Sequence, residues 1–324
     1  MVSSPIALSL TEIDAAAALI RAAVPPTPAY RWPLLCERLG VDVVLKHENH
    51  TPLGAFKVRG GLTYVDALRR RAPQVTRLVC ATRGNHGQSI AFAAARAGLR
   101  ATIVVPEGNS PEKNAAMRAL GAELVVHGRD FDDAKAYAER LTGADPHAEF
   151  VPSYHRDLVL GVATLARELF AAGSFDAVYV PIGLGSGISG MIAVRDLLGL
   201  STEIVGVVAE RFPAYARSFE AGTVVTSEPA ETIADGAAVR VPDPAAVAIL
   251  CAGAARVVAV PEPSIGEAMR WIFTDTHNVA EGAGAAPVAA IAAERARLGG
   301  RRVAAVLSGG NVDAAVFAGV LRKD

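Results

Sequence analysis

The 324-residue sequence predicts an α/β protein of two lobes, each a mostly parallel sheet flanked by helices. Short β-branched runs alternate with alanine-rich helical stretches almost from end to end, which is typical of βα units. Hydrophobic residues make up 51% of the chain and charged residues 20%, enough apolar side chains for large buried cores. This composition excludes disordered and fibrous proteins.

Strands are predicted where apolar and β-branched residues form short uninterrupted runs. These runs are residues 43–46, 78–81, 102–106, 123–127, 177–182, 204–209, 256–260 and 303–308. One helix is predicted to begin after Ser110, with Pro111 at its first position, and to end at Gly121. Another follows His86 and ends at Gly98.

The distribution of these elements predicts the domain organisation. Residues 71–150 hold three compact βα units, which suffice for a small lobe. We expect residues 1–70 and 151–324 to form a larger lobe, with a ligand cleft between the two.

Charge and cysteine content narrow the function classes. The 32 basic and 33 acidic residues leave a net charge of -1, which disfavours nucleic-acid binding. The three cysteines are widely spaced and fit neither a disulfide scaffold nor a zinc site. The N-terminus lacks a basic signal region, and the longest uncharged run, residues 177–194, contains proline, serine and glycine. We therefore expect a cytoplasmic protein with a small-molecule substrate and neither a nucleic-acid nor a membrane partner.

A glycine-rich segment, residues 183–190 (GLGSGISG), follows a predicted strand and opens a helix. Its glycines let backbone N–H groups and the helix dipole face an anion, so we predict a phosphate site. Residues 185–190 also satisfy GxGxxG, and Glu210 lies twenty residues further on, which together resemble a dinucleotide fingerprint. A tight turn without any ligand is the plainer alternative.

Lysine is scarce in this chain, so each lysine carries more weight. Only five of the 32 basic residues are lysines, and Lys57 lies between Phe56 and Val58 after a Pro/Gly loop. In a partly apolar site, desolvation lowers the pKa of an amine toward a reactive range. The alternative is a surface lysine paired with Glu48.

Residues 54–61 (GAFKVRGG) resemble the cofactor-lysine motif of the fold-type II pyridoxal-phosphate enzymes, in particular the threonine/serine dehydratase and serine racemase family. Four further segments stand in the family's order, so that the resemblance covers nearly the whole chain. They are residues 82–88 (TRGNHGQ), 231–239, 281–285 and 308–313.

The resemblance implies pyridoxal 5'-phosphate as cofactor, bound by the larger lobe, and a role for each matching residue. Lys57 would bind the cofactor covalently and remove the substrate's α-proton. Phe56 would pack near the ring, Asn85 would bond its 3'-hydroxyl, and Ser308 would meet the pyridine nitrogen. The phosphate would be bound by Gly183, Leu184, Gly185, Ser186 and Gly187. The substrate would be bound by Thr82, Arg83, Asn85 and His86.

The sequence departs from the family at several positions. Arg83 replaces a serine that acts as acid and base in racemases, and a guanidinium does not exchange its proton in this way, so racemisation is disfavoured. Glu210 matches one acidic ligand of the family's cation site, but Ala214 stands where a second is expected. We therefore predict no required metal. Only thirteen residues follow Asn311, so we expect no C-terminal regulatory domain.

The implied activity is α,β-elimination from a β-hydroxy-α-amino acid, giving a 2-oxo acid and ammonia. L-threonine and L-serine are the family's usual substrates, and a bulkier 3-phenylserine or 3-hydroxyaspartate stays open. The alternatives are an amino-acid racemase of the same fold, an NAD-dependent oxidoreductase using residues 185–190 and Glu210, and a catalytically silent binding protein. Family analogy implies a homodimer.

Overall fold

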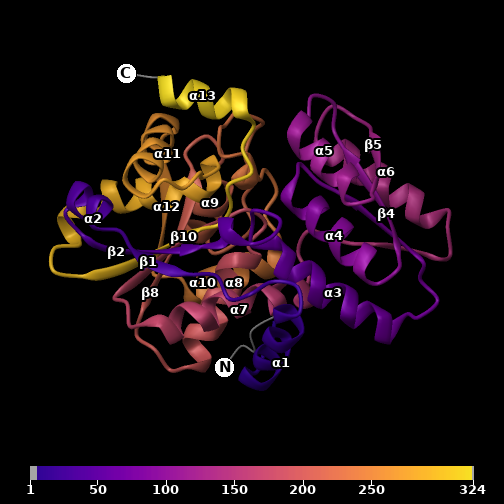
Figure 1. Ribbon diagram of the computed structural model, residues 1–324, viewed down its shortest axis with the longest axis horizontal. Helices are drawn as coiled ribbons and strands as arrows, with labels where there is room; N and C mark the ends of the chain where they lie inside the picture. The colour runs from indigo at the N-terminus through magenta and orange to yellow at the C-terminus, as the bar shows by residue number, and fades with distance from the viewer. Residues whose placement is uncertain (1–5, 323–324) are drawn as a thin grey trace.

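The structure, a computed structural model, describes residues 6–322, and these residues form two β-sheets (Figure 1). The larger sheet has the strand order β1-β2-β10-β7-β8-β9 and is parallel except for the β1–β2 pair. Its strands are β1 (Ala29–Arg31), β2 (Asp42–His47), β7 (Ala177–Pro181), β8 (Glu203–Ala209), β9 (Arg256–Val260) and β10 (Arg302–Leu307).

Helices cover both faces of the larger sheet because its strands alternate apolar side chains between the two faces. On β2, Val43 and Leu45 pack into one core, whereas Val44 packs into the other. The first core is closed by α2 (Pro33–Leu39), α11 (Glu262–Thr276), α12 (Gly282–Ala293) and α13 (Ala314–Arg322). The second is closed by α1 (Leu10–Arg21), α7 (Arg156–Ala172), α8 (Ser186–Leu197), α9 (Ala214–Ala221) and α10 (Pro244–Gly253).

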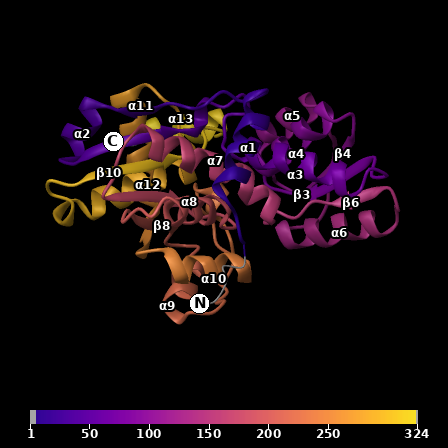
Figure 2. The ribbon, with the colours of Figure 1, turned by 90° about the horizontal axis from the view of Figure 1, so that it is seen from below.

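The smaller sheet is wholly parallel, with the strand order β5-β4-β3-β6, and lies beside the larger one (Figures 1 and 2). Its strands are β3 (Arg77–Ala81), β4 (Arg100–Val105), β5 (Glu123–Val126) and β6 (Ala148–Phe150). Its helices are α3 (Lys57–Arg71), α4 (Asn85–Arg96), α5 (Pro111–Ala119) and α6 (Phe131–Gly143). Helix α3 also packs on α7 of the larger body.

The predicted two-lobed α/β class is confirmed, and each of the predicted strands forms. The structure adds two that sequence reasoning missed, β1 and β6, because each has only three residues. Ser110 caps α5 by accepting from the Lys113 N–H at 3.1 Å, and α4 begins at Asn85, next to the predicted start. The lobe boundaries at residues 70 and 150 stay a prediction.

Between residues 6 and 322, no helix is both long enough and apolar enough to span a membrane.

Candidate active site

A cavity of about 400 Å³ lies where strands of the larger sheet end and where α3, α4 and α8 begin. Carboxyl ends of parallel strands and amino ends of helices meet at the same edge of such a sheet, which is the usual place for a ligand. All of the predicted site residues line this cavity. They are Phe56, Lys57, Thr82, Arg83, Asn85, His86, Gly183, Leu184, Gly185, Ser186, Gly187 and Ser308.

Lys57 is the first residue of α3, and its amine faces the cavity. Among residues 6–322 its Nζ has neither a hydrogen-bond nor an ion-pair partner, and the Phe56 ring lies 4.8 Å away. Burial lowers the pKa of the amine from 10.5 to about 8, although the Glu281 carboxylate partly offsets this. The alternative that Lys57 pairs with Glu48 is wrong, because Glu48 binds Arg59. A substantial fraction of the amine is therefore neutral near physiological pH.

The end of β10 fixes the segment that carries Lys57. The Phe56 N–H donates to the Ser308 carbonyl at 3.0 Å, and Ala55 forms an isolated β-bridge with Gly309. The Ser308 side chain lies in the same cavity and is almost fully buried. Lys57 and the Ser308 hydroxyl thus approach one ligand from two fixed backbone segments.

The glycine loop joins β7 to α8 and leaves the first N–H groups of that helix without a side-chain cap. Gly185 has a φ of 98°, and a Cβ there would lie 2.6 Å from the Ala246 Cβ. A Cβ on Gly183 would lie 2.6 Å from the Gly236 carbonyl. Since both positions exclude a side chain, the loop keeps its backbone donors open to the cavity, as an anion requires.

A second helix begins at the cavity without a side-chain cap, at Asn85 of α4. Just before it, the Thr82 hydroxyl accepts from the Gly84 and Gly87 N–H groups, at 2.9 and 3.2 Å. The Gly87 N–H is thus bonded to Thr82, whereas the Asn85 and His86 N–H groups have no partner among the described residues and stay near the cavity. The cavity therefore receives two helix amino ends and suits a ligand with two anionic groups.

Asn85 is held from both sides. Its Nδ2 donates to Glu281 Oε1 at 2.8 Å, and its Oδ1 accepts from Asn311 Nδ2 at 2.9 Å. An amide nitrogen carries two hydrogens, so one remains for a ligand. The orientation of this side chain is thus set before any ligand arrives.

His86 is buried, and its Nε2 has no hydrogen-bond partner in the described part of the chain. Burial, together with the charge of Lys57, lowers the pKa of this imidazole to about 3, although a hydrogen bond with the Val151 backbone opposes the shift. His86 is therefore neutral at any ordinary pH, which fits a positioning role rather than that of a base.

At the cavity wall, Arg83, which the sequence predicts to bind substrate, joins a charged group whose other members sequence reasoning missed: Lys113, Asp235 and Glu281. Asp235 accepts from Arg83 Nε at 2.8 Å and from Lys113 Nζ at 3.2 Å, and Lys113 lies 3.8 Å from Glu281. Burial, assisted by Asp235, raises the pKa of Glu281 despite the opposing Lys113. The scarcity of lysine was the one signal that pointed to Lys113.

Glu210, the acidic residue of the dinucleotide fingerprint, does not line the cavity. Gly190, the last glycine of that fingerprint, packs on α7, where a Cβ would lie 3.0 Å from the Ala163 nitrogen. No group of three or more His, Cys, Asp or Glu side chains within residues 6–322 is arranged to bind a metal ion. That the protein needs no metal stays a prediction.

The cavity fits pyridoxal phosphate on chemical grounds. The half-buried Lys57 amine, with its lowered pKa, suits an aldehyde, and the uncapped start of α8 suits a phosphate. The buried polar atoms His86 Nε2 and Glu281 Oε2 have no hydrogen-bond partner among the described residues, although Lys113 lies 3.8 Å from Glu281 Oε2. Polar atoms left in this state are rare unless a ligand or water satisfies them.

Comparison with known proteins agrees with this chemistry. Residues 20–309 match the family described as "Pyridoxal-phosphate dependent enzyme". L-threonine ammonia-lyase of Thermotoga maritima is 31% identical, over 98% of this chain and 79% of that protein. L-threo-3-hydroxyaspartate ammonia-lyase of Saccharomyces cerevisiae is 31% identical, over 91% of this chain and 90% of that protein.

A solved structure adds to these relatives. The crystal structure of a threonine deaminase from T.th. superimposes with a TM-score of 0.88 at 32% identity, covering 94% of this chain and 99% of that one. Together with the match over residues 20–309, these likenesses show that the chain belongs to the pyridoxal-phosphate-dependent enzymes of fold type II and uses pyridoxal 5'-phosphate as its cofactor.

Proposed function

We propose that this protein is a lyase that dehydrates and deaminates a β-hydroxy-α-amino acid, with L-threonine or L-serine as the first substrates to test. The observation that carries the proposal is the half-buried Lys57, whose amine has a pKa near 8 and shares one cavity with the glycine loop and Ser308. Its relatives include enzymes named as threonine and 3-hydroxyaspartate ammonia-lyases.

Each of the site residues has a role in this proposal. The glycine loop, residues 183–187, would bind the cofactor phosphate, Phe56 would pack near the ring, and Asn85 would donate to the ring's 3'-oxygen. The start of α4, with Thr82 and His86, binds the substrate carboxylate. The helix amino ends of α8 and α4 support the phosphate and carboxylate roles, and the family resemblance implies those of Phe56 and Asn85.

Pyridoxal phosphate, when bound, withdraws electrons from the substrate's α-carbon and so acidifies its proton. The neutral amine of Lys57 removes that proton. The β-hydroxyl leaves as water, and the released enamine takes up water and loses ammonia, which leaves a 2-oxo acid. Ser308 would offer the ring nitrogen a neutral hydroxyl rather than a carboxylate, which would make the ring a weaker electron acceptor and favour elimination over transamination.

The outer part of the cavity favours including bulkier substrates in the test. Phe131 and Val239 line it together with the cations Arg83 and Arg240. These side chains suit either the aryl group of a 3-phenylserine or the carboxylate of a 3-hydroxyaspartate.

Release of ammonia and 2-oxo acid from L- and D-isomers of serine, threonine, 3-hydroxyaspartate and 3-phenylserine tests the proposal. We expect turnover of at least one L-isomer and none by Lys57→Ala. A protein that binds pyridoxal phosphate but releases no ammonia from any of them contradicts the lyase.

Racemisation is the second candidate, because racemases share the fold. Arg83 stands at the family's acid–base position, and its Nε is bound to Asp235. We therefore expect no D-isomer to accumulate while the L-substrate is consumed, as chiral chromatography of the reaction measures. Equal amounts of the two isomers at early times would instead favour a racemase.

We also infer a reducing compartment such as the cytoplasm and, by family analogy alone, a homodimer. The compartment is supported by three free cysteines, of which Cys36 and Cys80 are buried.

A further inference from the structure

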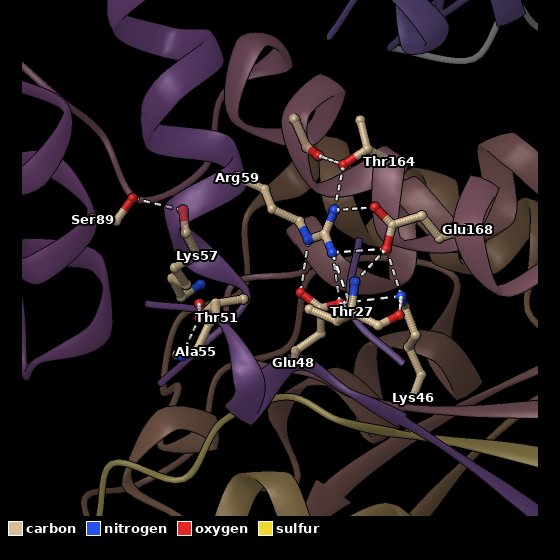
Figure 3. Close-up of polar contacts among 11 residues, drawn as sticks. Thr27, Lys46, Glu48, Thr51, Ala55, Lys57, Arg59, Ser89, Thr164 and Glu168 are labelled. Atoms are coloured by element: carbon tan, nitrogen blue, oxygen red, sulfur yellow. Dashed lines mark hydrogen bonds and ion pairs between the residues drawn. The ribbon is translucent and has the colours of Figure 1, made fainter. Parts of the chain in front are cut away.

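A buried cluster of four charged side chains lies behind the turn that carries Lys57 (Figure 3). The cluster consists of Lys46, Glu48, Arg59 and Glu168, contributed by β2, the turn after it, α3 and α7. The side chains of Lys46, Glu48 and Arg59 are at most 1% exposed, and that of Glu168 is 16% exposed. None of these groups lines the cavity.

Arg59 is the centre of the cluster. Its Nε donates to Glu48 at 2.8 Å, and its Nη1 and Nη2 each donate to one oxygen of Glu168 at 2.8 Å. The hydroxyl of Thr164 accepts from Nη1 at 3.1 Å. Lys46 donates to Glu168 at 2.5 Å and to the Thr27 carbonyl at 2.7 Å. Two cations and two anions balance, and nearly every donor has an acceptor.

Such a cluster contributes little net stability to the fold. Desolvating four charges costs about as much as their attraction returns, and well-packed apolar residues often do as well or better. The fork of a guanidinium, however, fixes direction, because two parallel hydrogen bonds are made in one plane only. The cluster therefore fixes the position of α3 against α7 and β2.

Interactions within the helix contribute little to holding the start of α3 in place. Phe56 provides no side-chain cap, and two glycines, Gly60 and Gly61, follow within the first turns. Glycine disfavours a helix interior by about 1 kcal/mol relative to alanine. What holds this turn is tertiary contact, since the Lys57 carbonyl accepts from Ser89 at 2.6 Å and the Arg59 side chain enters the cluster.

We propose that Arg59 is a positioning residue for Lys57: its anchored guanidinium holds the first turn of α3 so that the Lys57 amine stays aimed at the cofactor and the substrate's α-carbon. Lys57 and Arg59 leave the same helical turn in different directions (Figure 3). Lys57 lines the cavity, whereas Arg59 enters the cluster. This inference rests on the proposed lyase function for its kinetic prediction but not for its spectroscopic one.

The test compares Arg59→Lys with a matched control, Arg256→Lys. Arg256 also bridges two carboxylates, Glu203 at 2.6 Å and Glu294 at 2.5 Å, but it begins β9, at the end of the sheet away from the cavity. Both variants keep the charge and lose the fork. For each holoenzyme, we would measure the thermal midpoint, the visible circular dichroism of the bound cofactor, kcat and KM.

For Arg59→Lys, we expect a changed cofactor dichroism and a kcat lowered about 10- to 100-fold, the loss typical of a misplaced catalytic group, with KM nearly unchanged. For Arg256→Lys, we expect a lower thermal midpoint with dichroism and kcat as in the wild type. Thr164→Val, which removes one acceptor but no charge, should give a smaller change of the same kind and decides the matter if Arg59→Lys does not fold.

Unchanged dichroism and kcat in a folded Arg59→Lys, or equal kinetic losses in both arginine variants, would overturn the proposal. If the wild type binds the cofactor but turns over no amino acid, the lyase function fails while the dichroism comparison still decides the role of Arg59.

Discussion

Catalysis requires the desolvated amine of Lys57, but the same desolvation lowers the stability of the folded protein. A lysine amine that loses water without gaining a counter-ion destabilises the folded state while it is protonated. Its pKa is about 8 in the folded protein and 10.5 ordinarily, so the unfolded chain binds this proton more tightly. The penalty is complete below pH 8 and disappears as the pH rises toward 10.5.

Lys57→Met should therefore stabilise the cofactor-free protein at pH 7, by about 1–3 kcal/mol, while abolishing turnover. Urea unfolding at pH 7 and near pH 10 measures the effect, which should shrink at the higher pH. Lys135→Met is the matched control, because that lysine is 48% exposed and its nearest carboxylate, Glu139, is 3.9 Å away. A Lys57→Met protein that is less stable than wild type at pH 7 would contradict the argument.

His86 leads to a prediction about pH dependence. With a pKa near 3, it cannot produce an inflection in the activity between pH 5 and pH 8. We expect His86→Asn to lower kcat/KM while leaving the midpoint of the acid limb where it is in the wild type. Initial rates across this pH range provide the comparison, and a displaced midpoint would assign the titration to His86.

At the scale of helices, α3 and α7 approach so closely that the contact excludes side chains. A Cβ on Gly161 of α7 would lie 2.2 Å from the Arg59 carbonyl and 2.3 Å from the Thr63 hydroxyl. The same crossing brings Glu168 within reach of Arg59. Gly161 of α7 is thus a condition for the ion pair that joins α7 to α3.

Gly161→Ala should lower the free energy of unfolding by about 1–3 kcal/mol, since two backbones must move apart. Gly143→Ala, at the end of α6, is the control, because no atom lies within 4 Å of the added methyl. That change should be neutral or stabilising by up to about 1 kcal/mol. Chemical denaturation of both variants checks this, and similar effects at the two sites would argue against the crossing.

At the scale of the whole molecule, ion pairs bridge the two bodies at the mouth of the cavity. Arg83 and Lys113 reach Asp235, and Arg240 lies 3.5 Å from Asp132 of α6. Lys113 is buried, but Arg83, Asp235, Arg240 and Asp132 are partly exposed, so salt weakens the ion pairs of these exposed groups and each pair adds little to stability. We expect these ion pairs to affect mainly how closely the two bodies approach each other.

We expect KM for the substrate to rise between about 0.1 M and about 1 M salt, over which the screening length falls from about 10 to about 3 Å. The rise should be smaller in Arg240→Gln, with a thermal midpoint close to that of the wild type. Using both sodium and tetramethylammonium chloride separates screening from binding of a specific ion. Equal salt dependence in the two proteins would rule out a role for this contact.

Whether a feature could be predicted from the sequence depends on how far apart in the chain its interacting residues lie. Strands such as β7 and the cap at Ser110 depend on neighbouring residues, and they could be predicted. The partners of Arg59 could not, because Glu168 lies 109 positions away and is reached only after the larger body has folded. The sequence likewise allows Glu48 as a partner of Lys57, whereas in the structure Glu48 forms its ion pair with Arg59.

The buried cluster also limits which substitutions this sequence can accumulate during evolution. Losing one member leaves an unpaired charge in the interior, which typically costs about 3–5 kcal/mol, whereas replacing all four by apolar residues can be neutral. Intermediates between those two sequences are therefore disfavoured, so Lys46, Glu48, Arg59 and Glu168 should be inherited as a set. An engineer who redesigns this interior would have to exchange all four side chains in one step.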